Sequence, residues 1–262
     1  YTVALRVVGE GTVDPAAGAY TYAAGTTQRF RATPASGNVF LGWTVDGTFV
    51  GFGVAMGLPI TGDRGIVATL AASPQFCHIS PATPNYEAIA NLAARGIIKG
   101  SDNPNGPGKC FLPDDILLRI HVAGFVARAF GWDQEDHGND FIDRGAVDPD
   151  LWRNAGTLAY YDVARGYRDG TYDPLGPVLH AQAVSFVTRA MIRKEYWALQ
   201  EDNATFYTAV PTTSGHRQDA VTYLTYAGNI PGTSAPTDAW GDYDAPATRS
   251  AFARILWQAY SS

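Results

Sequence analysis

In the second half of the chain, apolar residues recur with the period of an α-helix in three separate places. The three runs align when Leu118, Leu179 and Thr248 are superposed. Positions four, seven, eight and twelve residues further on are then apolar or aromatic in every run, and these offsets lie on one face of a helix. One such helix cannot bury its stripe alone, so the pattern predicts three copies of one unit packed together. The positions are Val122, Phe125, Val126 and Phe130, then Ala183, Phe186, Val187 and Met191, then Phe252, Ile255, Leu256 and Tyr260.

A turn-forming segment precedes the second run. Residues 164–174 read Ala-Arg-Gly-Tyr-Arg-Asp-Gly-Thr-Tyr-Asp-Pro and lie between two helical patterns. Gly166 suits the left-handed end of a helix, because glycine lacks the Cβ that penalises this conformation. A short strand is expected after the turn, and Pro174 ends it. The glycines of the three copies are 66 residues apart (166 − 100 and 232 − 166), which supports a repeated unit of helix, turn, short strand and helix; they are Gly100, Gly166 and Gly232.

Residues 1–72 have a different pattern. Short runs rich in β-branched and aromatic residues alternate with Gly, Pro and Asp, and none of the runs has a sustained helical period. The pattern predicts an all-β module. Trp43 is expected in its core, although a tryptophan can also stack on a sugar.

The second half resembles the S-layer homology (SLH) repeat. The middle copy carries Phe141-Ile142-Asp143 and the segment 166–174, and the third keeps Thr248-Arg249. The first copy carries an insertion at 101–109, and the third lacks the Tyr-x-Asp-Gly-Thr element. Residues 1–72 resemble the divergent InlB B-repeats of bacterial surface proteins. The resemblance implies an α+β multidomain protein: an all-β module followed by a mainly α-helical, pseudo-threefold SLH triple repeat, with copies at 73–138, 139–200 and 201–262.

The resemblance also implies a set of binding residues. In the SLH family, an arginine at the start of the second helix of a repeat helps bind an acidic, often pyruvylated, cell-wall polysaccharide. A guanidinium beside a helix N-terminus suits a carboxylate. The alternative, weighed equally, is that these arginines pair with acids of the adjacent repeat. The implied polysaccharide-binding residues are Arg119, Arg249 and His180, which replaces the arginine in copy two, together with Asp143, Trp152 and Gly166.

A histidine at this place adds a pH signature to the expected site. A site that uses His180 should bind an acidic glycan better below about pH 6.5, where the imidazole is charged.

Cys77 and Cys110 are the only cysteines of the chain. Two thiols cannot complete a four-ligand zinc site, although His78 is one further ligand nearby. In an extracellular protein the two cysteines are expected to form a disulfide, and two buried thiols are the alternative.

Charge and motifs limit the classes of function. The net charge is −6 and the pI about 5.3, which argues against a nucleic-acid or anionic-membrane partner. No apolar run approaches the ~18 residues of a membrane span. The chain begins at Tyr1 without Met or a signal peptide, so it is expected to be processed or cut from a longer protein. Motifs of catalysis are missing, so no enzyme activity, cofactor or metal is expected.

Two further segments leave questions open. Residues 133–140 gather oxygen ligands without the spacing of an EF-hand, so a solvated linker is favoured over a Ca²⁺ loop. Asn203 begins an N-glycosylation sequon, a triplet that often arises by chance.

The predicted function is therefore that of a non-enzymatic extracellular protein, held at the cell wall or S-layer by acidic polysaccharide. The alternatives are a self-assembling subunit of an S-layer or filament, and the anchoring region of a larger envelope enzyme. For assembly with copies of itself, the expected contact face comprises Tyr223, Tyr226, Trp240 and Tyr243. Packing within copy three is the alternative for these aromatic residues.

Overall fold

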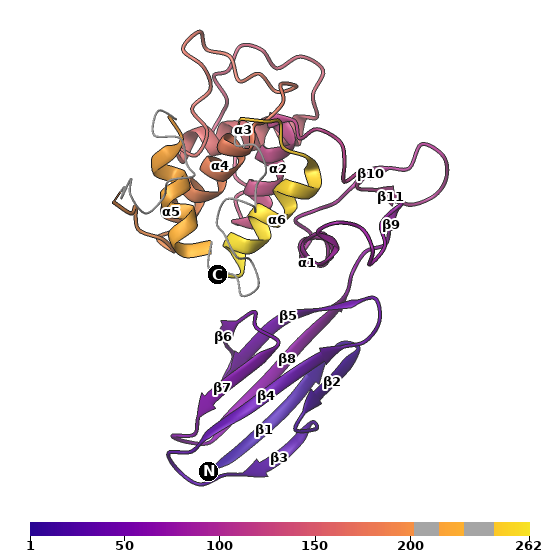
Figure 1. Ribbon diagram of the computed structural model, residues 1–262, viewed down its shortest axis with the longest axis vertical. Coiled ribbons are helices and arrows are strands. Elements are labelled where there is room, and N and C mark those ends of the chain that lie inside the picture. Colours follow the sequence, from indigo (N-terminus) through magenta and orange to yellow (C-terminus); the bar gives the residue numbers. More distant parts are fainter. Residues whose placement is uncertain (202–214, 228–243) are drawn as a thin grey trace. The chain divides into compact units, whose positions relative to one another are not determined.

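The computed structural model describes residues 1–201, 215–227 and 244–262 (Figure 1). Its contacts group the chain into two compact units. The first contains Tyr1–Cys77 and Ile89–Lys109, and the second His78–Ala88 and Cys110–Tyr260. The architecture is α+β, as predicted, with sheets in the N-terminal region and helices in most of the remainder. The expected first repeat, 73–138, contributes to both units.

Two β-sheets share the core of the N-terminal region. One has the strand order β3-β1-β8-β5-β6 and the other β2-β4-β7. Strand β1 pairs with β8 in parallel, and β8 pairs with β5 antiparallel. The bounds are β1 Thr2–Val8, β2 Gly11–Asp14, β3 Gly18–Thr21, β4 Thr27–Pro34, β5 Asn38–Val45, β6 Thr48–Gly51, β7 Ala55–Pro59 and β8 Arg64–Ala72.

Alternation along the strands produces this core. In β1, Val3 and Leu5 are buried while Thr2 and Ala4 are exposed, because successive side chains of a strand point to opposite faces. Trp43 is 1% exposed, and its Nε1 donates a hydrogen bond to the carbonyl of Gly53 at 2.9 Å. The prediction that Trp43 is a core residue is confirmed.

A small three-stranded sheet contains both cysteines. Its order is β10-β11-β9, with β9 at Phe76–Cys77, β10 at Ser101–Asp102 and β11 at Lys109–Cys110. Cys77 and Cys110 lie on neighbouring strands and are joined in a disulfide, so the predicted pairing is confirmed.

The helices follow the predicted apolar faces. At offsets four, seven and eight the side chains of α2, α4 and α6 are buried, as the alignment of the three runs predicts. At offset twelve Phe130 and Met191 are also buried, and Tyr260 is half-buried. The helices are α1 Tyr86–Ala94, α2 Arg119–Ala129, α3 Pro149–Tyr160, α4 His180–Arg193, α5 Arg217–Ala227 and α6 Arg249–Tyr260.

A closed ring of backbone hydrogen bonds joins the segments before α2, α4 and α6. The Leu117 N–H donates to Ala247 at 2.9 Å, Ala247 to Val178 at 2.8 Å, and Val178 to Leu117 at 2.9 Å. The first N–H of each helix is bonded across the same ring, because Arg119 donates to Gly176, His180 to Ala245 and Arg249 to Asp115. Neighbouring backbone therefore satisfies donors that a helix N-terminus leaves open.

The turn after α3 is held by Asp143 and Gly166. The Asp143 carboxylate accepts hydrogen bonds from the backbone N–H groups of Tyr172 and Asp173, at 2.8 and 2.7 Å. Gly166 has φ +66°, and a Cβ there would lie 2.4 Å from the Phe141 ring. The prediction of a short strand after this turn is wrong, because residues 171–173 have no strand conformation. Further along, Pro177 forms an isolated β-bridge with Leu118.

Candidate functional site

The first residue of α2, Arg119, is a buried cation held by backbone and rings. It is 7% exposed, and its Nε donates to the carbonyl of Tyr172 at 2.8 Å. The guanidinium carbon lies 5.0 to 5.3 Å from the ring centroids of Tyr172, Tyr167 and Phe186. These cation–π contacts stabilise a charge that burial would otherwise disfavour. The contacts come from the turn after α3 and from α4, so Arg119 lies at the junction of α2 with these elements.

Arg249 repeats this arrangement at the junction of α6 with α2 and the segment before α2. It is also 7% exposed, and its Nε donates to the carbonyl of Phe111 at 2.7 Å. Its guanidinium lies 5.0 Å from the ring centroid of Phe111 and 5.9 Å from that of Phe125. Phe125 stands seven residues after Leu118, as Phe186 stands seven after Leu179. The two arginines therefore occupy matching positions with matching contacts.

Neither arginine forms an ion pair with a carboxylate among the residues that the structure describes. Backbone carbonyls and aromatic rings of the neighbouring elements stand where the sequence analysis considered acidic partners. Burial lowers the pKa of Arg249, and the negative charge of Asp115 partly offsets this shift.

His121 lies against Arg249, with its Nδ1 3.3 Å from Nη1 of the arginine. Burial, with the charges of Arg249 and Arg128, lowers the pKa of His121 to about 4. This histidine is therefore neutral near pH 7.

His180 begins α4 at the third matching position. Its Nδ1 lies 3.1 Å from the carbonyl oxygen of Ala245, which also accepts the backbone N–H of His180. Ile255 stands where the other two junctions have Phe186 and Phe125. This junction therefore differs in both its cation and its apolar wall.

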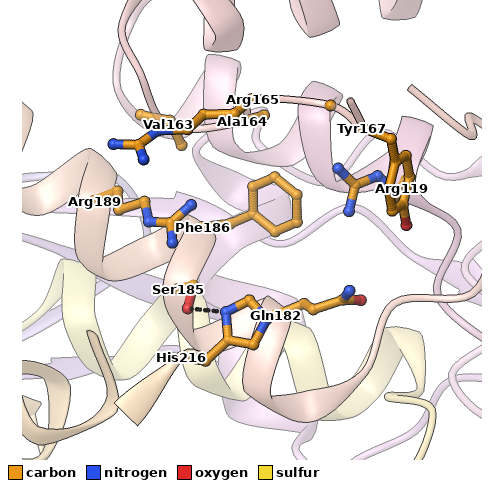
Figure 2. A pocket seen from close by; sticks show the side chains of 11 residues that line it. Arg119, Val163, Ala164, Arg165, Tyr167, Gln182, Ser185, Phe186, Arg189 and His216 are labelled. Carbon is orange, nitrogen blue, oxygen red and sulfur yellow. Dashed lines mark hydrogen bonds between the residues drawn. The ribbon is translucent and has the colours of Figure 1, made fainter. Parts of the chain in front are cut away.

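A cavity of about 220 Å³ opens beside Arg119. Figure 2 shows Arg119 next to Tyr167 at one end and Arg189 toward the other. The wall comes from the start of α2, the segment after α3, one face of α4 and the residue before α5. The lining residues are Arg119, Val163, Ala164, Arg165, Gly166, Tyr167, Gln182, Ser185, Phe186, Arg189 and His216.

The charged side chains that line this cavity are basic. Arg165 pairs with Asp162 at 2.5 Å, and Arg189 pairs with Asp219 at 2.9 Å. Each of these ion pairs is neutral as a whole. The charge of Arg119 is therefore the one that no ion pair among the described residues balances. The cavity therefore carries a net charge of about +1 while its histidine is neutral, which suits a monoanion such as a carboxylate.

The predicted binding residues do not all converge on this cavity. Arg119 and Gly166 line it, whereas Arg249 and His180 lie at the other two junctions. Asp143 holds the turn through its hydrogen bonds to the backbone of Tyr172 and Asp173 and does not line the cavity. Trp152 is buried and packs edge-on against Phe141 and Tyr172, with centroid distances of 6.2 and 6.3 Å. The structure thus places Trp152 in the packing between α3 and the turn that follows it, and not on the cavity wall.

Sequence reasoning missed Arg165, Arg189, Ser185 and His216. Arg189 had a detectable signal, because it stands ten residues after Leu179 as Arg128 stands ten after Leu118. His216 had none, since it precedes α5 and reaches the cavity through tertiary packing.

The expected assembly face is corrected in part. Tyr223 is 1% exposed and its hydroxyl donates to the carbonyl of Ile255 at 2.8 Å, so it lies inside the helical unit and offers no surface contact. Tyr226 is half-buried and stacks on Trp197 with a centroid distance of 5.1 Å. Trp240 and Tyr243 lie outside the described residues.

The acidic segment 133–140 has its own contacts. Glu135 Oε2 accepts the Tyr161 hydroxyl at 2.6 Å and lies 2.8 Å from His137 Nε2. Among the residues that the structure describes, no group of three or more His, Cys, Asp or Glu residues is placed to hold a metal ion. Asn203 lies outside the described residues.

Comparison with known families gives two matches. Residues 1–74 match the divergent InlB B-repeat domain, and residues 76–123 match the S-layer homology domain. The second match lies within the first of the three expected copies and points to a protein associated with the cell surface. No curated protein matches the chain. In the described part of the chain, none of the helices has both the length and the apolar character that crossing a membrane requires.

Proposed function

We propose that this chain is an extracellular surface protein that attaches to an acidic polysaccharide of the cell envelope. Its attachment site is the cavity at Arg119. The observation that carries the proposal is a buried guanidinium, uncompensated by any described carboxylate, at the wall of a basic cavity. In this proposal the chain acts by binding alone and catalyses no reaction.

The helical region is proposed to consist of three S-layer homology repeats, at 73–138, 139–200 and 201–262. Two observations support this. The same backbone ring joins Leu117, Val178 and Ala247, and the first residues of α2, α4 and α6 donate matching backbone N–H bonds to carbonyls of neighbouring segments. Arg119 and Arg249 also make matching contacts to the next copy in the ring.

The cavity offers the two kinds of surface that an acidic sugar substituent needs. Nε of Arg119 is engaged by Tyr172, so the two terminal nitrogens are the atoms that present paired N–H donors to a carboxylate. Val163, Ala164 and Phe186 provide an apolar wall beside it. A pyruvate ketal carries both a carboxylate and a methyl group, and it fits this combination.

The test is co-sedimentation of the full chain with purified cell-wall polysaccharide. Arg119→Gln keeps a hydrogen-bond donor and part of the stem but removes the charge. Loss of a charge-assisted fork should weaken binding roughly tenfold to a hundredfold. Arg144→Gln, at an exposed position away from the cavity, makes the same change in net charge and should bind as the parent chain does.

Arg249→Gln measures whether the second junction contributes. Circular dichroism of each variant establishes that it is folded. A folded Arg119→Gln protein that binds polysaccharide as tightly as the parent would show that the cavity is not the attachment site. Electron microscopy of the same preparations distinguishes attachment from self-assembly.

A further inference from the structure

His216 lies at the edge of the cavity, directly before α5. Its Nδ1 is 2.8 Å from the hydroxyl oxygen of Ser185 on α4, and Figure 2 shows this bond among the lining side chains. The ring is half-buried. A titratable group in this place can change the charge of the cavity without any movement of the backbone.

The bond to Ser185 is compatible with both charge states of the imidazole. A serine hydroxyl can donate to an unprotonated Nδ1 or accept from a protonated one. When the neutral ring carries its hydrogen on Nε2, gain of a proton at Nδ1 reverses the direction of the bond and leaves the contact in place. The ring stays positioned in either state.

Charged groups from four parts of the helical unit act on His216. They are Arg189 on α4, Arg119 on α2, Asp219 on α5 and Asp244 before α6. Burial lowers the pKa of His216, the two arginines lower it further, and the two aspartates oppose them. Together these groups favour the neutral imidazole, and an anion placed among them would favour the charged form.

We propose that His216 is a conditional second cation of the cavity, which takes up a proton from solvent when an anionic ligand binds between Arg119 and Arg189. The proposal rests on the proposed function of the cavity as a site for acidic glycans. With the imidazole neutral, the cavity favours a single carboxylate. With the imidazolium formed, it also accommodates a dianionic group.

Linkage fixes the direction of the pH dependence. The bound form has the higher histidine pKa, so affinity is independent of pH below the pKa of the unliganded protein and above that of the complex. Between these two values the dissociation constant should rise with pH by up to about tenfold per unit, the limit for one proton taken up.

The first experiment follows the imidazole itself by NMR. The His216 ring resonances of the full chain are titrated with acid in the absence and presence of pyruvate, used as a monocarboxylate probe, and of malonate, used as a dicarboxylate probe. The proposal expects both to raise the pKa of His216, malonate more. A titration that neither probe displaces overturns it.

The second experiment measures polysaccharide binding from pH 5 to 8 with three variants. His216→Asn preserves a hydrogen-bonding atom near the Nδ1 position and should remove the pH slope of the dissociation constant. His137→Asn, an exposed histidine outside the cavity, should keep the slope. His180→Asn tests whether the histidine at the start of α4 contributes to the pH slope of binding.

The outcomes separate the two proposals. If the parent chain binds and His216→Asn keeps its slope, the role of His216 is wrong and the attachment function stands. If the slope disappears only in His180→Asn, the linked proton belongs to the other junction and the inference is overturned. If the parent chain binds no polysaccharide at any pH, the proposed function fails, and the NMR titration alone decides the role of His216.

Discussion

Arginine and histidine occupy equivalent places at the three helix starts, and their surroundings decide what each can do. Arg119 has Tyr167 and a cavity beside it, whereas Arg249 has His121 against its terminal nitrogen. The equivalent of His121 in α4 is Gln182, which lines the cavity, and in α6 it is Ala251. Small side-chain differences on one scaffold thus make three chemically different junctions.

The pKa of His121 predicts a loss of stability in acid. The folded protein holds this histidine neutral down to a pKa of about 4, whereas in the unfolded chain it takes up a proton near 6.5. Stability should therefore fall as the pH drops from about 6.5 to 4, by roughly 1–3 kcal/mol after allowance for partial exposure.

Urea unfolding at several pH values measures this effect. His121→Gln, which installs the residue that α4 has at the same place, should flatten the acid limb of the curve. If parent and variant lose stability in parallel, another group is responsible.

Gly166 provides a test of backbone strain with an internal control. Both Gly166 and Gly131 are left-handed, with φ +66° and +71°, but only Gly166 has atoms within contact distance of a built Cβ. Gly131→Ala should cost about 1 kcal/mol from conformation alone, and Gly166→Ala a further 1–3 kcal/mol, roughly, from overpacking against Phe141. Thermal unfolding compares the two variants, and equal costs would show that Phe141 yields without penalty.

At the scale of elements, the sequence predicted helices better than it predicted the site. The offsets counted from Leu118, Leu179 and Thr248 identified the buried faces of α2, α4 and α6, because a period of 3.6 residues is local information. Their starts follow from the same alignment. The cavity could not be predicted in this way, because Arg119, Arg189 and His216 come from three elements whose convergence depends on packing. The expected strand after Gly166 failed because Asp143, not a partner strand, holds that backbone.

The disulfide between β9 and β11 closes a loop of 33 positions (110 − 77), which contains α1 and residues 101–109. Restricting the unfolded chain over such a loop should contribute about 4 kcal/mol. The double variant Cys77→Ser/Cys110→Ser should therefore melt at a lower temperature and become insensitive to reductant. The parent chain treated with dithiothreitol is the matched comparison, and an unchanged melting temperature in both would show that the bond adds no stability.

At the scale of the whole molecule, a basic cavity is carried by an acidic protein. The net charge is −6, whereas the cavity has one uncompensated arginine. An acidic polysaccharide is therefore repelled at long range and attracted at short range. This differs from a polybasic surface, on which attraction acts at every distance.

The opposition of these two terms predicts an unusual response to salt. Screening acts strongly on exposed charges beyond about 8–10 Å and weakly on a buried contact. Raising the salt concentration to about 0.15 M should leave polysaccharide binding unchanged or slightly tighter. Co-sedimentation across a salt series measures this, and a steep loss of binding would indicate attachment through exposed basic residues instead of the cavity.

The bonds that join Leu117, Val178 and Ala247 are made entirely by main-chain atoms, which has a consequence for how this protein tolerates change. A linear repeat array ends in two special caps, but a closed circuit of three has no end to protect. Apart from proline, which lacks the N–H, apolar residues of suitable size can occupy these fully buried places. The ring therefore depends on the size and apolar character of these side chains and on no polar side-chain group. The three helix starts can therefore differ in their side chains, as Arg119, His180 and Arg249 do, while the backbone ring that positions them stays closed.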